Sequence, residues 1–140
     1  IELAVFIPLI ISSGGNAGSQ SASLMIRALA IGEVQPSDWL KVLSREAITS
    51  LALGLVLGLL GFGRAFFTGE AGQAIPLAAT ISIATLSVVV VGSMVGSLLP
   101  ILIQRLGFDP AVSSTPFIAS LVDVVGLLIY LTVAKLILLS

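Results

Sequence analysis

A single aspartate lies in the middle of a long apolar stretch near the end of the chain, in the sequence FIASLVDVVGLLIYL. Placing a charged side chain at the centre of a bilayer costs about 2.5–3.5 kcal/mol even on the lenient insertion scale, and such residues mark ion or proton pathways. No Lys or Arg in the same stretch pairs with Asp123. We therefore expect its carboxylate to face a wet cavity or an ion path; the alternative is a protonated or internally hydrogen-bonded structural Asp.

Small and polar residues share a helix face with Asp123. Positions three or four apart lie on one face of a helix, and this rule links Asp123 to Thr115, Ala119, Gly126 and Tyr130. The Thr, Ala and Gly side chains are small enough to leave room beside the carboxylate. This face is therefore the candidate ion-facing side of the segment.

A second polar element, SSGGNAGSQS at residues 12–21, separates the apolar stretches IELAVFIPLII and ASLMIRALAIG. Glycine weakens helices and permits close backbone approach, and non-helical backbone at membrane depth is tolerated where it is buried in protein or lines water. We predict a glycine-interrupted segment that forms a cavity wall, with a tight helix crossing as the alternative. The candidate pore-lining residues are Gly14, Gly15, Gly18, Ser19 and Gln20 of this segment, together with Gly126, and Asn16 is a candidate residue of the metal site.

All the candidate ligands are oxygens: one carboxylate, hydroxyls, side-chain amides and backbone carbonyls. Oxygen ligands suit hard cations such as Mg²⁺, Ca²⁺ or Mn²⁺. The chain has no Cys and no His, which removes disulfides, thiolate chemistry and the commonest transition-metal ligands. Because one Asp cannot balance a divalent charge, we expect a homodimer, the commonest closed assembly, that brings two copies of Asp123 together.

The composition places these residues in a bilayer. Hydrophobic residues make up 57% of the 140 residues and charged residues 9%, whereas an average soluble domain is about 25% charged; the mean hydropathy is +1.20. The net charge of −1 argues against a nucleic-acid partner, because surfaces that bind nucleic acids are dominated by Lys and Arg. The expected partners are the lipid bilayer and divalent cations.

Four segments have the length of a membrane span, which needs about 20 apolar residues as a helix. We expect them at about 1–31 (with the polar interruption), 47–67, 75–103 and 110–139. The loops at 32–46 and 104–109 lie on the side richer in Lys and Arg, which predicts that they are cytoplasmic. Two glycine pairs, at 54 and 58 and at 92 and 96, are expected to serve ordinary helix packing. The prediction is an all-α, multi-pass integral membrane domain.

Two stretches, PLIISSGGNAGSQSASLMIRALAIGE and GFDPAVSSTPFIASLVDVVGLLIYL, resemble the membrane domain of the bacterial MgtE family of magnesium channels and transporters. The resemblance covers essentially all of residues 1–140. It implies a homodimeric pore in the bacterial inner (cytoplasmic) membrane with five helices per subunit, of which this chain supplies the second to the fifth. Nothing in the sequence resembles the first family helix or the cytoplasmic regulatory domains.

The resemblance also implies roles for individual residues. The family's acidic residue for hydrated Mg²⁺ corresponds to Asp123, and the backbone oxygens near the ion correspond to those of Ala119 and Thr115. Residues 14–20 are expected to face the same pore, where Asn16 would form hydrogen bonds with the ion's waters. We therefore expect a Mg²⁺ channel or transporter, not an enzyme, whose site could also take Mn²⁺ or Ca²⁺. A Na⁺- or H⁺-coupled divalent cation exchanger is the alternative, and a non-transporting membrane scaffold is a third hypothesis.

Overall fold

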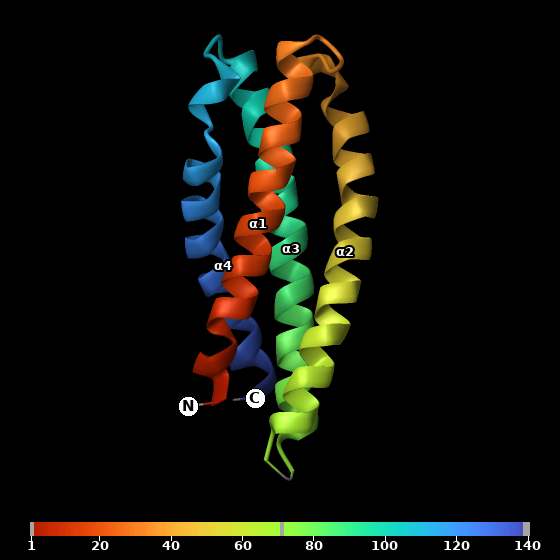
Figure 1. Ribbon diagram of the computed structural model, residues 1–140, viewed down its shortest axis with the longest axis vertical. Helices are drawn as coiled ribbons and strands as arrows, with labels where there is room; N and C mark the ends of the chain where they lie inside the picture. Colours follow the sequence, from red (N-terminus) through yellow and green to blue (C-terminus); the bar gives the residue numbers. More distant parts are fainter. Residues whose placement is uncertain (1, 71, 139–140) are drawn as a thin grey trace.

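The computed structural model describes residues 2–70 and 72–138, which form four long antiparallel helices (Figure 1). Two short 3₁₀ helices, η1 and η2, precede the second and the fourth long helix. The elements are α1 (Glu2–Ala30), η1 (Pro36–Asp38), α2 (Trp39–Thr68), α3 (Ala74–Arg105), η2 (Pro110–Val112) and α4 (Thr115–Leu138). The all-helical prediction is confirmed for these residues; the expected segment ends at 1 and 139 lie outside them.

Helix α3 is the centre of the bundle. It packs against α1, α2 and α4, and α1 also packs against α4. In Figure 1, α1 crosses in front of α3, with α4 on one side and α2 on the other. The α1–α2 and α3–α4 connections lie at the same end of the bundle, and the start of α1 and the end of α4 lie at the opposite end. The two loops that the sequence placed on one side of a membrane therefore share one end of the fold.

The helix ends follow from local sequence. Gly32 and Gly107 have φ values of 76° and 85°, a left-handed conformation that glycine adopts without steric cost, and each follows the end of a long helix. Before α4, the Asp109 carboxylate accepts a hydrogen bond from the Ala111 amide at 2.9 Å and caps η2. Short turns of this kind make consecutive helices antiparallel neighbours.

Three helical segments in the described part of the chain are long and apolar enough to cross a membrane: Pro36–Thr68, Ala74–Arg105 and Thr115–Leu138. They match the three later predicted spans, although the first of them begins well before residue 47. Helix α1 is not among these three, because residues 12–21 lower its apolar character. Its 29 residues nevertheless give it a length of about 43 Å at 1.5 Å per residue.

The prediction that glycines interrupt the first segment is wrong, because α1 is helical without a break from Glu2 to Ala30. Residues 12–21 interrupt the apolar sequence but not the helix. A continuous helix satisfies its own backbone hydrogen bonds, and packing against α3 holds the glycines in the helical conformation.

Glycines bring α1 and α3 into backbone contact. A Cβ at Gly18 would lie 2.9 Å from the carbonyl oxygen of Gly92, and a Cβ at Gly92 would lie 2.6 Å from the carbonyl oxygen of Gly14. A Cβ at Gly96 would lie closer still to the Gly18 carbonyl oxygen. Side chains do not fit at these contacts, so the alternative of a tight helix crossing is the one the structure adopts at Gly14 and Gly18.

The second glycine pair joins α2 to α3. A Cβ at Gly58 would lie 3.0 Å from the Ser82 carbonyl oxygen, and one at Gly54 would lie 3.2 Å from the Leu86 carbonyl oxygen. Both glycine pairs, at 54 and 58 and at 92 and 96, therefore serve helix packing, as predicted.

The apolar core lies where α1, α3 and α4 meet. Ile10, Ile81, Val88 and Tyr130 are fully or almost fully buried there. The Tyr130 hydroxyl donates a hydrogen bond to the Leu3 carbonyl oxygen at 2.7 Å, which supplies the partner that a buried Tyr requires. This contact ties α4 to α1 and fixes how the two helices face each other.

Candidate functional site

Asp123 lies on α4 where this helix passes the glycine-rich part of α1. Its side chain is half-buried, and a Cβ at Gly15 would lie 2.8 Å from Asp123 Oδ1 and 3.9 Å from the Ala119 carbonyl oxygen. Among residues 2–70 and 72–138 the carboxylate has no basic partner within 4.0 Å and accepts no hydrogen bond. The structure therefore does not support the alternative of an internally hydrogen-bonded structural Asp.

A second contact between α1 and α4 lies next to the carboxylate. Ser19 Oγ donates a hydrogen bond to the Thr115 carbonyl oxygen at 3.3 Å. Gly15 and Ser19 are one turn apart on α1, and Thr115, Ala119 and Asp123 follow one another at single turns on α4. We call these five residues the α1–α4 seam.

The seam concentrates oxygen atoms on one side of the bundle. Four of its members are half-buried, and Gly15 is buried. A backbone carbonyl oxygen carries two lone pairs, so each can accept one hydrogen bond beyond that of the helix. At Thr115 this second bond comes from Ser19, and the Ala119 carbonyl oxygen can still accept one. The structure thus brings together Asp123, Ala119, Thr115, Ser19 and Gly15 from the predicted set.

Three predicted pore-lining glycines lie elsewhere. Gly14 and Gly18 contact α3, and a Cβ at Gly126 would lie 2.9 Å from Val88 Cγ1, also on α3. These residues are buried in helix contacts, which corrects the expectation that they line a passage. The reason is angular: one helical residue turns by about 100°, so neighbours of Gly15 and Asp123 point toward α3 instead of the seam.

Asn16 and Gln20 are exposed on the outer side of α1. Together with Ser12 they line a groove of about 560 Å³, whose other wall includes Leu53 and Leu57 of α2. Asn16 Nδ2 donates a hydrogen bond to Ser12 Oγ at 3.3 Å. Within one chain, Asn16 therefore faces the side of α2, whereas Asp123 lies in the α1–α4 seam.

A contact that the sequence analysis missed joins α1 to α2. Ser21 Oγ donates a hydrogen bond to Glu46 Oε1 at 2.6 Å, and both side chains are half-buried. Glu46 was assigned to a loop because apolar length alone was used to place the start of the second span. The helical spacing of apolar residues from Trp39 onward was the signal that would have placed Glu46 on a helix.

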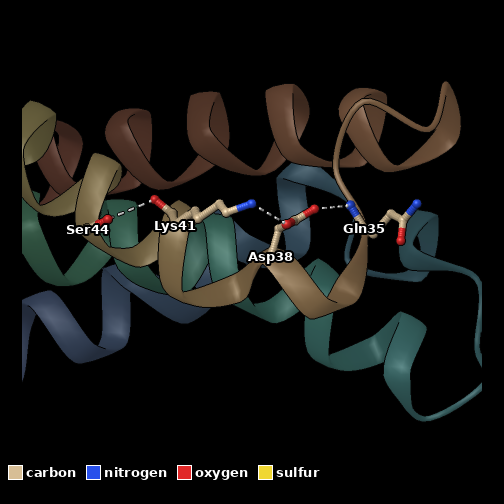
Figure 2. Close-up of polar contacts among 4 residues, drawn as sticks. All are labelled: Gln35, Asp38, Lys41 and Ser44. Atoms are coloured by element: carbon tan, nitrogen blue, oxygen red, sulfur yellow. Dashed lines mark hydrogen bonds and ion pairs between the residues drawn. The ribbon is translucent and has the colours of Figure 1, made fainter.

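Polar contacts at the loop end of the bundle organise the start of α2 (Figure 2). Asp38 accepts a hydrogen bond from the Gln35 amide at 3.0 Å and pairs with Lys41 Nζ at 3.2 Å, while Ser44 Oγ donates to the Lys41 carbonyl oxygen at 3.0 Å. An exposed pair of this kind contributes little to stability, because water screens its charges. No cluster of three or more His, Cys, Asp or Glu side chains in the described ranges could hold a metal.

The same end is tied to α3 by Arg105. Its Nε donates a hydrogen bond to the Pro36 carbonyl oxygen at 3.0 Å, and its guanidinium carbon lies 6.0 Å from the centre of the Trp39 ring. Trp39 is partly exposed, as expected for a side chain at the membrane–water boundary. These contacts hold η1 and the start of α2 against the end of α3.

Comparison with known proteins adds independent evidence. A family model described as "MgtE: Divalent cation transporter" matches residues 7–133. The chain is similar to proteins named magnesium transporter MgtE, with 42% identity over 136 residues for that of Thermus thermophilus, 40% over 133 residues for that of Enterococcus faecalis and 31% over 135 residues for that of Bacillus subtilis.

These alignments cover 97%, 95% and 96% of this chain but 29% of each relative. The chain therefore spans about 29% of the length of the curated relatives it matches. The family resemblance inferred from the two motifs is confirmed, and the matched family is one of transporters, not enzymes. This chain belongs to the MgtE family of divalent cation transporters.

Proposed function

We propose that this chain is the pore domain of a dimeric Mg²⁺ channel or transporter in the bacterial cytoplasmic membrane, and that Asp123 recognises the hydrated ion. The observation that carries the proposal is the half-buried Asp123 carboxylate, which has no ion-pair or hydrogen-bond partner in the described residues. The names of the three relatives support Mg²⁺ as the transported ion.

An unpaired carboxylate at membrane depth needs water or a cation, because lipid cannot stabilise its charge. Two carboxylates, one from each subunit of a two-fold dimer, balance the charge of one divalent ion. Mg²⁺ gives up its waters reluctantly, so the carboxylates would bind its hydration shell. The Ala119 carbonyl oxygen of the α1–α4 seam, whose second lone pair is free, then accepts a hydrogen bond from the same waters.

The outer face of α1 supports a second copy or water in front of the seam. Ser12, Asn16 and Gln20 are exposed at intervals of one turn, and lipid offers no hydrogen bonds to these side chains. Helix α1 also packs against α3 and α4, two of the helices that can span a membrane. In our proposal α1 also crosses the membrane, in addition to the three helices α2, α3 and α4. Its polar face, including Asn16, borders the passage between subunits.

The distribution of basic residues supports the orientation. The α1–α2 and α3–α4 connections share one end of the bundle (Figure 1), and Lys41, Arg45 and Arg105 lie in or next to them. Arg64 and Lys135 lie toward the other end of their helices. By the positive-inside tendency, the end with the two connections is cytoplasmic.

The test is Mg²⁺ uptake into liposomes that contain purified wild-type protein or Asp123→Asn. The substitution keeps the side-chain shape and removes the charge, so we expect the initial flux to fall at least about tenfold, the effect of losing one charge-assisted hydrogen bond, while the dimer is retained on size-exclusion chromatography. Glu33→Gln removes an exposed carboxylate in the α1–α2 connection and should leave flux unchanged. Wild-type flux in Asp123→Asn would overturn the proposal.

The same liposomes separate a channel from an exchanger. Uptake that proceeds without an opposing Na⁺ or pH gradient supports a channel. Uptake that requires either gradient contradicts a channel mechanism and assigns a coupled exchange to the same carboxylate.

A further inference from the structure

We infer that Gly15 is a positioning residue for the Asp123 carboxylate, because the missing side chain at Gly15 is what gives that carboxylate its place in the α1–α4 seam. The inference rests on the proposed function of Asp123 and deepens it. It assigns to one glycine of the glycine-rich segment a role in ion recognition that its neighbours do not share.

The contacts around Gly15 single out one atom. A Cβ at this position would lie 2.8 Å from Asp123 Oδ1, whereas the next nearest atoms, Asp123 Cγ and the Ala119 carbonyl oxygen, are both 3.9 Å away. Ordinary van der Waals contact begins at 3.4 Å. An added methyl group would therefore push the carboxylate oxygen by about 0.6 Å and leave the other surroundings almost untouched.

The neighbouring glycines face different groups. A Cβ at Gly14 would overlap the Val88 side chain and lie 3.2 Å from the Val88 carbonyl oxygen, and a Cβ at Gly18 would lie 2.9 Å from the Gly92 carbonyl oxygen. Those neighbours are backbone or tightly packed side chains, which yield only if the helices separate. The neighbour of Gly15 is the end of a half-buried side chain that can rotate. Alanine at position 15 should thus displace Asp123 without disrupting the fold.

A glycine at position 15 makes helix α1 less stable than an alanine would, so its presence requires an explanation. Within a helix, alanine is favoured over glycine, and α1 is continuous through residue 15. Helix packing explains Gly14 and Gly18 but not Gly15, whose sole close neighbour is the carboxylate oxygen. Charge-assisted hydrogen bonds depend on distance and angle, so holding that oxygen in place matters for recognition of an ion's waters.

The first experiment measures Mg²⁺ flux into liposomes over a range of Mg²⁺ concentrations for Gly15→Ala and Gly63→Ala. Gly63 is a matched control, since it also lies within a helix but a Cβ there would meet no other part of residues 2–70 and 72–138 within 4 Å, apart from its own helix backbone and chain neighbours. We expect Gly15→Ala to raise the half-saturating Mg²⁺ concentration about tenfold or more, as loss of one charge-assisted hydrogen bond would. Gly63→Ala should match the wild type.

The second experiment measures thermal unfolding, so that a packing role is distinguished from a positioning role. Gly18→Ala should lower the Tm, because its new methyl group meets backbone. In the wild-type background, Gly15→Ala should not lower the Tm. In an Asp123→Ala background the space beside position 15 is empty, so Gly15→Ala should raise the Tm by as much as Gly63→Ala does. This dependence on Asp123 is the signature of the contact.

Three results would overturn the inference. The first is a flux curve for Gly15→Ala that coincides with that of Gly63→Ala. The second is a drop in Tm for Gly15→Ala as large as that for Gly18→Ala, which would assign Gly15 to helix packing. The third is an effect of Gly15→Ala on the Tm that is the same with and without Asp123.

If the flux curves coincide while Asp123→Asn still loses flux, the inference fails and the proposed function stands. Wild-type flux in Asp123→Asn removes the proposed function itself.

Discussion

Replacing Gly92 with alanine should force α1 and α3 apart. A Cβ at Gly92 would lie 2.6 Å from the Gly14 carbonyl oxygen, 3.1 Å from Val122 Cγ1 and 3.2 Å from the Gly14 carbonyl carbon. The closest of these distances is about 0.8 Å inside ordinary contact. Since the atom it meets belongs to a helical backbone, the side chain cannot be accommodated by a change of rotamer.

The expected magnitude follows from two opposing terms. Overpacking of a well-packed interior costs about 1–3 kcal/mol, and a separation of 0.5–1 Å forfeits about a quarter to a half of each dispersion contact across the crossing. The higher helix propensity of alanine raises the free energy of unfolding by about 1 kcal/mol. We therefore expect Gly92→Ala to lower the free energy of unfolding by up to about 2 kcal/mol relative to the wild type, which corresponds to a Tm lower by up to roughly 8 °C.

The assay is thermal unfolding of the purified protein in detergent, followed by circular dichroism. Gly63→Ala gains the same helix propensity without any new contact, so it provides the reference and should be at least as stable as the wild type. If Gly92→Ala were as stable as Gly63→Ala, the backbone contact between α1 and α3 would be refuted.

Two further predictions concern polar ties between helices. Tyr130→Phe removes the hydrogen bond to the Leu3 carbonyl oxygen and should lower the free energy of unfolding by about 0.5–1.5 kcal/mol, measured as a lower Tm; an unchanged Tm would show that this bond does not hold α4 to α1. Ser21→Ala leaves the half-buried Glu46 carboxylate without its partner at 2.6 Å and should cost about 1–3 kcal/mol. The control Ser44→Ala, at an exposed position, should change the same measurement by less than about 0.5 kcal/mol. Equal effects of the two Ser substitutions would contradict a specific tie between α1 and α2.

The structure explains how a mostly apolar bundle positions a charged group. The glycine contacts fix the distance between α1 and α3, and the contacts of Tyr130 with Leu3 and of Ser19 with Thr115 fix α4 against α1. Asp123 lies between these two hydrogen bonds along α4. Its surroundings are therefore determined at both ends, although the carboxylate itself is bonded to nothing in the described chain.

Several features were predictable because they depend on short-range sequence alone. Composition and the length of apolar runs predicted the all-helical class and four membrane segments, three of which correspond to helices long and apolar enough to cross a membrane. The absence of any Lys or Arg near Asp123 predicted a carboxylate without a basic partner. The start of α2 was predicted too late because charged residues end an apolar run but do not end a helix.

The sequence by itself determined that this chain is helical, with three segments long and apolar enough to cross a membrane and an aspartate that has no Lys or Arg in its own segment. Hydropathy and charge are properties of each segment. Only the tertiary structure decided what each residue of SSGGNAGSQS does. Gly14 and Gly18 turn toward α3, Gly15 toward Asp123 and Asn16 toward the groove beside α2. One helical residue rotates the side-chain direction by about 100°, so the role of each position depends on which helix lies in that direction, and this is a property of the packed bundle.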